Sequence, residues 1–153
     1  MGRPRRAGPL IRIAIRRLDT DVPLPAYARP GDAGMDLCAA EAVTVEAGAR
    51  VLVRTGIALA IPDGFAALVL PRSGLALRHG LTVLNSPGLI DAGYRGEVKV
   101  LVANTDPRTA VTLARGDRVA QLVVQRIEEV QLTEVDELPP SERGTGGFGS
   151  TGA

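Results

Sequence analysis

The stretch VLNSPGLIDAGYRGEVKV, residues 83–100, carries the most information in this chain. It places one carboxylate, Asp91, between two glycines, with Tyr94 and Arg95 directly after it. Runs of β-favouring residues flank it, which predicts a hairpin whose turn region lets the backbone approach a ligand closely. An Asp near Gly more commonly caps a turn. The stretch alone therefore leaves two interpretations of Asp91 open, a functional acid and a turn residue.

Glycines and prolines divide the rest of the chain into short segments rich in β-branched residues. Only residues 74–79 have the length and the Leu and Ala content of a short helix. Many short strands without alternating long helices predict an all-β sandwich or barrel. The segments expected to form strands are 11–15, 43–46, 50–55, 65–70, 98–102, 111–113 and 118–127.

The composition fits one domain with an aliphatic core. The chain has 153 residues, 3% aromatics and no Trp, so Val, Leu, Ile and Ala must fill the interior. The single cysteine, Cys38, cannot form an intramolecular disulfide, and with only one His in the chain a Cys/His zinc site is excluded. These features suit a reducing cytoplasm, which is the expected location.

The charge pattern suggests neither a nucleic-acid partner nor a membrane partner. Net charge is +1, and no stretch approaches the ~20 apolar residues of a membrane span. Arginines crowd the N-terminus, and residues 1–10 are expected to form a basic, solvated extension. Because the eighteen basic residues are seventeen Arg and one Lys, Lys99 within the opening stretch stands out.

The last eleven residues, RGTGGFGSTGA, contain five glycines and follow the linker-like PPSE. Such a sequence cannot belong to the core and predicts a mobile tail over residues 141–153, after a domain over 11–140. Arg143 can grip a phosphate and Phe148 can cover a base. The tail is therefore either a disordered terminus or a lid that awaits a ligand.

Residues 71–75, PRSGL, lie between an apolar strand and the short helix. Unpaired backbone N–H groups at such a turn, with a Ser hydroxyl and an Arg, suit an anion such as phosphate. The alternative interpretation, equally consistent with this sequence, is that Ser73 caps the helix and Arg72 is a surface residue.

Residues 32–37, DAGMDL, set two carboxylates four positions apart. In an extended segment Asp32 and Asp36 would point to the same face. One of them could hold Mg²⁺ through water, since Mg²⁺ keeps much of its hydration shell beside substrate phosphates. An Asx-turn is the alternative.

Residues 116–121, GDRVAQ, open the longest expected strand. Gln121 interrupts an apolar run, and a buried amide needs hydrogen-bond partners. Either the sheet or a ligand oxygen would supply them.

Taken in order, five segments resemble the five motifs of the trimeric dUTP diphosphatase (dUTPase) family. Any one of them is modest evidence, whereas five in the right order and spacing identify the chain as a member. The segments are DAGMDL (32–37), PRSGLA (71–76), NSPGLIDAGYRGE (85–97), GDRVAQLVV (116–124) and RGTGGFGSTG (143–152).

The resemblance implies a β jelly-roll or distorted β-barrel subunit with one short helix and a mobile Gly-rich C-terminal arm. It implies a homotrimer with three sites at the subunit interfaces, each closed by an arm. The implied reaction is the Mg²⁺-dependent hydrolysis of dUTP to dUMP and pyrophosphate, which limits uracil in DNA and supplies dUMP for dTMP synthesis.

The resemblance also implies roles for individual residues. Asp91 would orient and deprotonate the water that attacks the α-phosphorus, and Tyr94 would lie under the deoxyribose and exclude a 2′-hydroxyl. Asp36 would support Mg²⁺ through its waters. The remaining substrate contacts would be Asn85, Gly88, Leu89 and Ile90 at uracil, Arg72, Ser73, Gly74 and Gln121 at the phosphates, Arg143 at the γ-phosphate, Phe148 and Gly149 in the tail, and Lys99.

Two rival functions follow from other features. A dCTP deaminase shares the fold, but it needs a glutamate at the pyrimidine ring, and the only Glu in the opening stretch, Glu97, lies beyond the turn. A nucleotide-binding regulator that has lost the reaction is the second rival. Intact Asp91, Gln121 and Arg143 argue against it.

Overall fold

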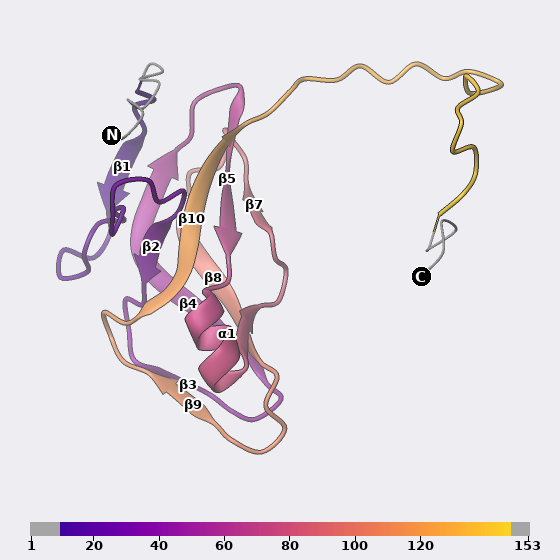
Figure 1. Ribbon diagram of the computed structural model, residues 1–153. Helices are drawn as coiled ribbons and strands as arrows, with labels where there is room; N and C mark the ends of the chain where they lie inside the picture. The colour runs from indigo at the N-terminus through magenta and orange to yellow at the C-terminus, as the bar shows by residue number, and fades with distance from the viewer. Residues whose placement is uncertain (1–9, 148–153) are drawn as a thin grey trace, which may run out of the picture.

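The structure, a computed structural model, describes residues 10–147 and is all-β there apart from one short helix (Figure 1). The fold class is therefore as expected. No helix of the described residues is long and apolar enough to cross a membrane. In chain order the elements are β1 (Ala14–Arg17), β2 (Met35–Cys38), β3 (Val43–Val45), β4 (Arg50–Ala60), β5 (Phe65–Leu70), α1 (Ser73–His79), β6 (Leu81–Val83), β7 (Gly88–Ile90), β8 (Glu97–Asn104), β9 (Val111–Leu113) and β10 (Arg118–Arg126).

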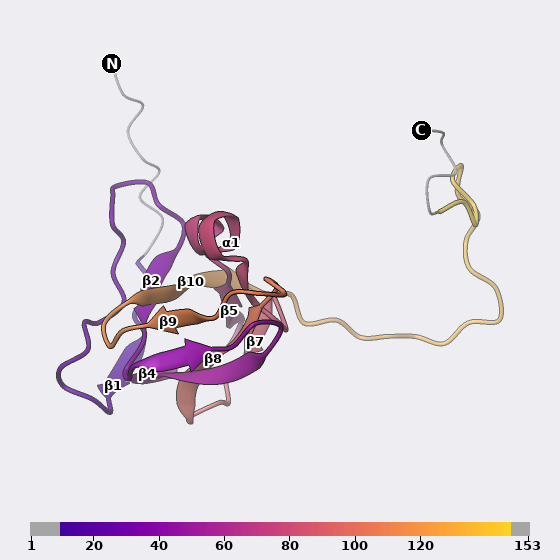
Figure 2. The ribbon, with the colours of Figure 1, turned by 90° about the horizontal axis from the view of Figure 1, so that it is seen from below.

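The strands form two four-stranded sheets and one two-stranded sheet. Their orders are β1-β4-β8-β6, β2-β10-β5-β7 and β3-β9, and the pairings are antiparallel. Figure 2 shows β4 and β8 below β2 and β10, so the larger sheets lie as two layers. This is the jelly-roll-like arrangement expected of the chain.

The core between the layers is aliphatic, as the composition predicts. Along β8, Val98, Val100 and Val102 are each at most 2% exposed, while the intervening Lys99 points to solvent. This alternation is the period of a strand with one buried face. From the facing sheet, Leu37 and Leu122 are each 1% exposed and belong to the same core cluster.

The expected strands are present with shifted ends, and three short ones were not expected. β1 covers 14–17 rather than 11–15, and β4 continues to residue 60 rather than 55. The additional strands β2, β6 and β7 have four, three and three residues. Segments of that length show too few repeats for their periodicity to be recognised.

The expected hairpin across residues 83–100 is wrong. β7 pairs with β5 in one sheet, whereas β8 lies in the other sheet between β4 and β6. Both edges of β8 are thereby occupied, so β7 has no free edge of β8 to pair with. The stretch instead crosses from one sheet to the other, and the turn that carries Asp91 makes the crossing.

A bulge interrupts the pairing of β4 with β8. The register runs from Arg54 opposite Lys99 to Ala58 opposite Glu97, so β4 contains extra residues there. Gly56 lies in the bulge with φ of 70°, a left-handed conformation that favours glycine. The Thr55 hydroxyl, which is buried, donates to the Val98 carbonyl.

After β10 the chain leaves the body of the molecule. Residues 127–147 contain no strand or helix and run away from the sheets in both views (Figures 1 and 2). Val130, Leu132 and Leu138 in this arm are 74%, 92% and 84% exposed. These three apolar side chains therefore contribute nothing to the core of their own chain.

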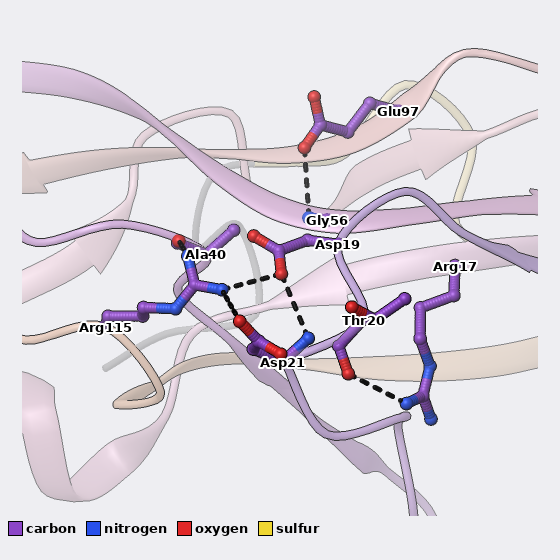
Figure 3. Close-up of polar contacts among 8 residues, drawn as sticks. All are labelled: Arg17, Asp19, Thr20, Asp21, Ala40, Gly56, Glu97 and Arg115. Carbon is purple, nitrogen blue, oxygen red and sulfur yellow. Dashed lines mark hydrogen bonds and ion pairs between the residues drawn. The ribbon is translucent and has the colours of Figure 1, made fainter.

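The loop between β1 and β2 is held by an ion pair to the turn before β10 (Figure 3). Arg115 donates to the Asp19 carboxylate at 2.6 Å and to the Ala40 carbonyl at 2.6 Å. The backbone N–H of Asp19 in turn donates to the Gly56 carbonyl at 3.1 Å. The hydrogen bond from Arg115 holds the pKa of the Asp19 carboxyl below its usual value.

We predict that Asp19→Asn lowers the melting temperature at neutral pH by roughly 1–3 °C, because an exposed ion pair contributes little. A carboxyl whose pKa is lower in the folded state stabilises the fold at pH values above its unfolded pKa of about 3.9. This stabilisation is lost as the pH falls through the folded pKa. The difference from wild type should therefore shrink below about pH 4 in melting curves. Asp63→Asn, at an exposed carboxylate, is the control, and a constant Asp19 difference at every pH would contradict the prediction.

Candidate functional site

A polar cavity of about 590 Å³ lies beside the start of α1 and the neighbouring ends of β2, β5 and β10. Three arginines and two aspartates reach it, so its charged groups sum to a positive charge at neutral pH. The lining residues are Ala28, Arg29, Asp32, Ala33, Gly34, Asp36, Arg72, Ser73, Gly74, Arg118 and Gln121.

Strand register brings three distant motifs to this cavity. Gln121 on β10 lies opposite Asp36 on β2 and opposite Leu70 on β5. β5 ends at Leu70, and the chain then turns through Pro71 and Arg72 into α1. Because Asp36, Gln121 and Leu70 share one row across the sheet, and Arg72 follows that row and bonds Asp36, the Asp, the Arg and the Gln lie together.

Asp36 forms ion pairs with two arginines. Its Oδ1 accepts a hydrogen bond from Arg72 Nε at 3.0 Å, and its Oδ2 from an Arg118 guanidinium nitrogen at 3.4 Å. Arg72 also donates to the Arg118 carbonyl at 3.4 Å. A guanidinium has five N–H donors, so both arginines retain donors for an anion while Asp36 fixes their position.

The start of α1 leaves backbone donors available. Arg72, not Ser73, is the N-cap residue, and no side chain caps the helix. The Ser73 and Gly74 N–H groups have no acceptor within residues 10–147, since the capping bonds to the Arg72 carbonyl come from Leu75 and Ala76. The alternative of an N-capping Ser73 is therefore wrong, and its hydroxyl remains exposed at the cavity.

Gln121 is oriented by one backbone carbonyl. Its amide nitrogen donates to the Pro71 carbonyl at 2.9 Å. Its amide oxygen lies against Gly34, where an added Cβ would come within 2.7 Å of that oxygen. The glycine of the DAGMD motif therefore makes room for the Gln121 side chain, whose one hydrogen-bond partner within the described residues is the Pro71 carbonyl just after β5.

Arg29 and Arg118 line the cavity although the sequence indicated no role for them, and Asp32, one of the two carboxylates considered for Mg²⁺, lines it too. Asp32 accepts the Arg29 N–H at 2.8 Å, so it shapes the loop as a turn residue would. Arg118 is three residues from Gln121, and strict alternation would put it on the opposite face. A register shift between Arg118 and Ala120 changes that alternation, and the sequence contains no pattern that predicts the shift.

A second, smaller cavity of about 70 Å³ lies beside β7. Gly88 permits close packing there, because a Cβ would lie 3.3 Å from Val69 Cβ and 3.5 Å from Asn85 Nδ2. β7 is the last strand of its sheet, so its outer edge has backbone groups without a neighbouring strand. The four residues expected at uracil, Asn85, Gly88, Leu89 and Ile90, all line this cavity, and so does Lys99. The other lining residues are Val69, Val83, Val100 and Leu101.

Asp91 and Tyr94 lie on the exposed turn after β7. The Asp91 carbonyl accepts the Tyr94 N–H at 3.1 Å, and its carboxylate has no hydrogen bond or ion pair within the described residues. Tyr94 is 46% exposed and donates from its hydroxyl to the Glu97 carbonyl at 2.9 Å. Neither residue lines either cavity within this chain.

The tail residues are only partly described. Arg143 donates from Nε to the Gly146 carbonyl at 2.8 Å within the arm and lines neither cavity. Phe148 and Gly149 lie outside the described residues. Arg143 does not reach the cavity that Arg72 and Gln121 line in its own chain, and its expected convergence with these residues, which involves the arm of another chain, stays a prediction.

Cys38 is not a nucleophile. It is buried and free, and burial, followed by the nearby Asp36 charge, raises the pKa of its thiol. A protonated buried thiol is a poor nucleophile. The site therefore offers arginines, carboxylates and backbone N–H groups for chemistry without a covalent intermediate.

The fold and these cavities define a β-sandwich protein with a polar cavity lined by three arginines. A family model described as dUTPase matches residues 20–152. The chain belongs to the dUTPase family.

Two relatives and two solved structures extend this result. The deoxyuridine 5′-triphosphate nucleotidohydrolase of Thermobifida fusca is 66% identical over 142 residues, covering 93% of this chain and 79% of that protein. The enzyme of that name from Rhodococcus erythropolis is 56% identical, covering 93% and 87%. A mutant dUTPase of Staphylococcus bacteriophage 80alpha with dUpNHpp superposes with a TM-score of 0.86 at 27% identity, covering 93% and 99%. A mutant dUTPase from phage phi11 of S. aureus, described with a structural Mg(II) ion, gives 0.77 at 26% identity, covering 83% and 98%.

We predict that Gly34→Ala displaces the Gln121 side chain and slows dUTP turnover by about tenfold or more, while stability changes by about 1 kcal/mol or less. The new methyl group meets the flexible end of Gln121, so the chain can relieve the clash by breaking the bond to Pro71. Steady-state kinetics and melting curves measure both effects. The double variant with Gln121→Ala should be no slower than Gln121→Ala alone, and additive losses would contradict this coupling.

Proposed function

We propose that this chain hydrolyses dUTP to dUMP and pyrophosphate with Mg²⁺, through attack of water on the α-phosphorus. The observation that carries the proposal is the cavity where Arg72, Gln121 and Asp36 meet, in a chain whose relatives are named for dUTP hydrolysis. Phosphoryl chemistry asks a protein mainly for positioning and neutralisation of charge. In the cell the reaction would limit uracil in DNA and supply dUMP for dTMP synthesis, and the free, buried Cys38 suits a cytoplasmic enzyme.

The triphosphate would occupy the larger cavity. Arg72 and the N–H groups of Ser73 and Gly74 would contact the phosphates, and Gln121 would approach the α-phosphate. The Asp36 ion pairs hold Arg72 before the ligand arrives, which spares the cost of ordering its long side chain. Arg118 and Arg29 add positive charge to the same cavity.

The residues fit an Mg²⁺ ion that is held mainly by the substrate. Within residues 10–147 no group of three or more His, Cys, Asp or Glu side chains could form a protein cage. Mg²⁺ commonly keeps several waters and uses one or two carboxylates plus phosphates. Asp36, already paired with two arginines, would hold the ion through its waters. When bound, the ion neutralises charge on the phosphates.

The base and the sugar would lie beside β7. Asn85 and the free backbone edge of Gly88 to Ile90 can pair with the uracil edge, as an added strand would. Tyr94 would lie under the deoxyribose and leave no room for a 2′-hydroxyl. Lys99 lines the same small cavity and counts among the substrate contacts.

Asp91 would act as the general base. Its carboxylate is exposed and, within the described residues, free of any ion pair, so it remains available to a water molecule. The backbone turn to Tyr94 fixes its position. A carboxylate so placed can orient the attacking water and take its proton.

The complete site would form in a homotrimer. The two cavities share no lining residue, and Asp91 and Arg143 line neither. The arm leaves its own body with apolar side chains exposed, which suits packing on a neighbouring copy. Arg143, Phe148 and Gly149 would then close a neighbour's site, with residues 141–153 as the lid and 1–10 outside the 11–140 domain.

A deaminase reaction is disfavoured by the state of Glu97. Its carboxylate accepts hydrogen bonds from the Gly56 N–H at 3.0 Å and from Arg54 Nε at 3.1 Å. A glutamate so engaged is not free to exchange protons at a pyrimidine ring.

Incubation with dUTP, dCTP, dTTP and UTP in the presence of Mg²⁺ tests the function directly. We expect pyrophosphate from dUTP alone and none when a chelator removes the metal. Asp91→Asn should lower kcat by roughly 10²–10⁴-fold while a non-hydrolysable dUTP analogue still binds. Release from dCTP, or from none of the four, would overturn the proposal, and lost binding would return Asp91 to a turn residue.

Mixing two inactive variants tests the shared site. Asp91→Asn and Gln121→Ala change residues that would reach one site from different chains. When equal amounts are unfolded together and refolded, about one quarter of the sites should carry both intact residues. Activity should recover accordingly, with each variant refolded alone as the control. If the mixture stays as inactive as its components, each site belongs to one chain.

A further inference from the structure

Glu97 holds an unusual position at the start of β8, directly after the turn that carries Asp91 and Tyr94. Its side chain is only 12% exposed. A carboxylate that is mostly removed from water requires partners, and both of its oxygens have one on β4. Oε1 accepts the Gly56 N–H at 3.0 Å, drawn in Figure 3, and Oε2 accepts Arg54 Nε at 3.1 Å.

The backbone of the same residue holds Tyr94. The Tyr94 hydroxyl donates to the Glu97 carbonyl at 2.9 Å, so the phenol folds back along its own chain. Gly96 permits this, since a Cβ at that position would lie 2.5 Å from the Tyr94 hydroxyl oxygen. The position of the ring therefore depends on where the start of β8 is fixed.

Glu97 lies opposite Ala58 on β4, and its side chain adds further hydrogen bonds to that strand. The β4–β8 register is interrupted between Arg54 and Ala58, so regular strand pairing does not run unbroken to the start of β8. The Glu97 carboxylate bridges the interruption by binding Gly56 within the bulge. Without it, the residue that anchors Tyr94 would lose its side-chain tie to β4.

The other side of the bulge is also held by hydrogen bonds. The Gly56 carbonyl accepts the N–H groups of Leu18 at 2.7 Å and Asp19 at 3.1 Å. An added Cβ on Gly56 would lie 2.8 Å from Asp19 Cβ, so the loop and the bulge are in close contact. The Asp19–Arg115 ion pair holds that loop in turn. Glu97 is therefore bonded to a glycine whose position is fixed by the neighbouring loop.

The geometry points to Glu97 as a positioning residue that sets the selectivity for deoxyribose over ribose. It acts through its backbone carbonyl on Tyr94, and its carboxylate keeps that carbonyl in place. The inference rests on the proposed function, in which Tyr94 lies under the sugar. Glu97 lines neither cavity, so its effect should fall on discrimination between dUTP and UTP.

The test is the ratio of kcat/KM for dUTP to that for UTP in wild type, Glu97→Ala and Glu97→Gln. We expect Ala to lower this ratio by roughly tenfold to a hundredfold, because small misplacements at a site have large effects. Gln keeps an oxygen that can accept the Gly56 N–H, so it should restore most of the ratio. The Tyr94→Phe variant should also lower the ratio, and Glu97→Ala should add little to it.

Asp106→Ala is the matched control, because Asp106 is another half-buried carboxylate with two partners, the N–H groups of Arg108 at 2.8 Å and Thr109 at 3.0 Å. It should lower the melting temperature without changing the ratio. If Glu97→Ala lowers only the melting temperature and leaves the ratio as in wild type, Glu97 is merely structural. Should Glu97→Ala fail to fold, Glu97→Met, which keeps the length of the side chain but cannot accept the Gly56 N–H, must still lower the ratio, and an unchanged ratio overturns the inference.

The wild-type ratio separates this inference from the proposed function. A wild type that does not prefer dUTP to UTP, or hydrolyses neither, refutes the function itself. A wild type that prefers dUTP while both Glu97 variants keep the same preference refutes the role of Glu97 alone.

Discussion

The candidate phosphate site depends on the pairing of β10 with β2 on one edge and β5 on the other. This pairing sets Gln121 opposite both Asp36 and Leu70 and thereby joins three segments that are far apart in the sequence. A shift of one residue in either register would turn Gln121 toward the opposite face of the sheet. The apolar neighbours of Gln121, Ala120 and Leu122, are buried, which fixes the register through the core. The burial of Ala120 and Leu122 therefore determines which way the Gln121 side chain points.

The bulge in β4 has a corresponding role for the turn that carries Asp91 and Tyr94. The bulge interrupts the pairing of β4 with β8 between Arg54 and Ala58, and the Glu97 carboxylate bridges the interruption by accepting the Gly56 N–H. Bulges next to functional sites commonly re-aim side chains in this way. A single glycine with a positive φ, Gly56, thus connects the body of the sheet to a turn that must be accurately placed.

Sequence analysis predicted the β class and the longer strands because runs such as Val98 to Val102 alternate clearly. The order of the motifs predicts that Arg72, Asp36 and Gln121 belong to one site, and the register brings the three residues together. Their contacts with phosphate stay a prediction. Sequence analysis could not predict Arg118, whose direction is set by a register shift, nor reject the hairpin at 83–100, since nothing in those letters shows that both edges of β8 are occupied. The contacts of Arg143 depend on the path of the arm, which local propensity does not determine.

The arm after Arg126 has a consequence for stability. In a trimer whose subunits exchange such arms, part of the apolar burial of each subunit forms only on association. Unfolding then becomes a dissociation as well, so the midpoint of thermal unfolding rises with protein concentration, unlike that of a monomer. Dilution would then destabilise the fold and separate the residues of the site at the same time. Folding and catalytic activity would therefore depend on protein concentration in the same way.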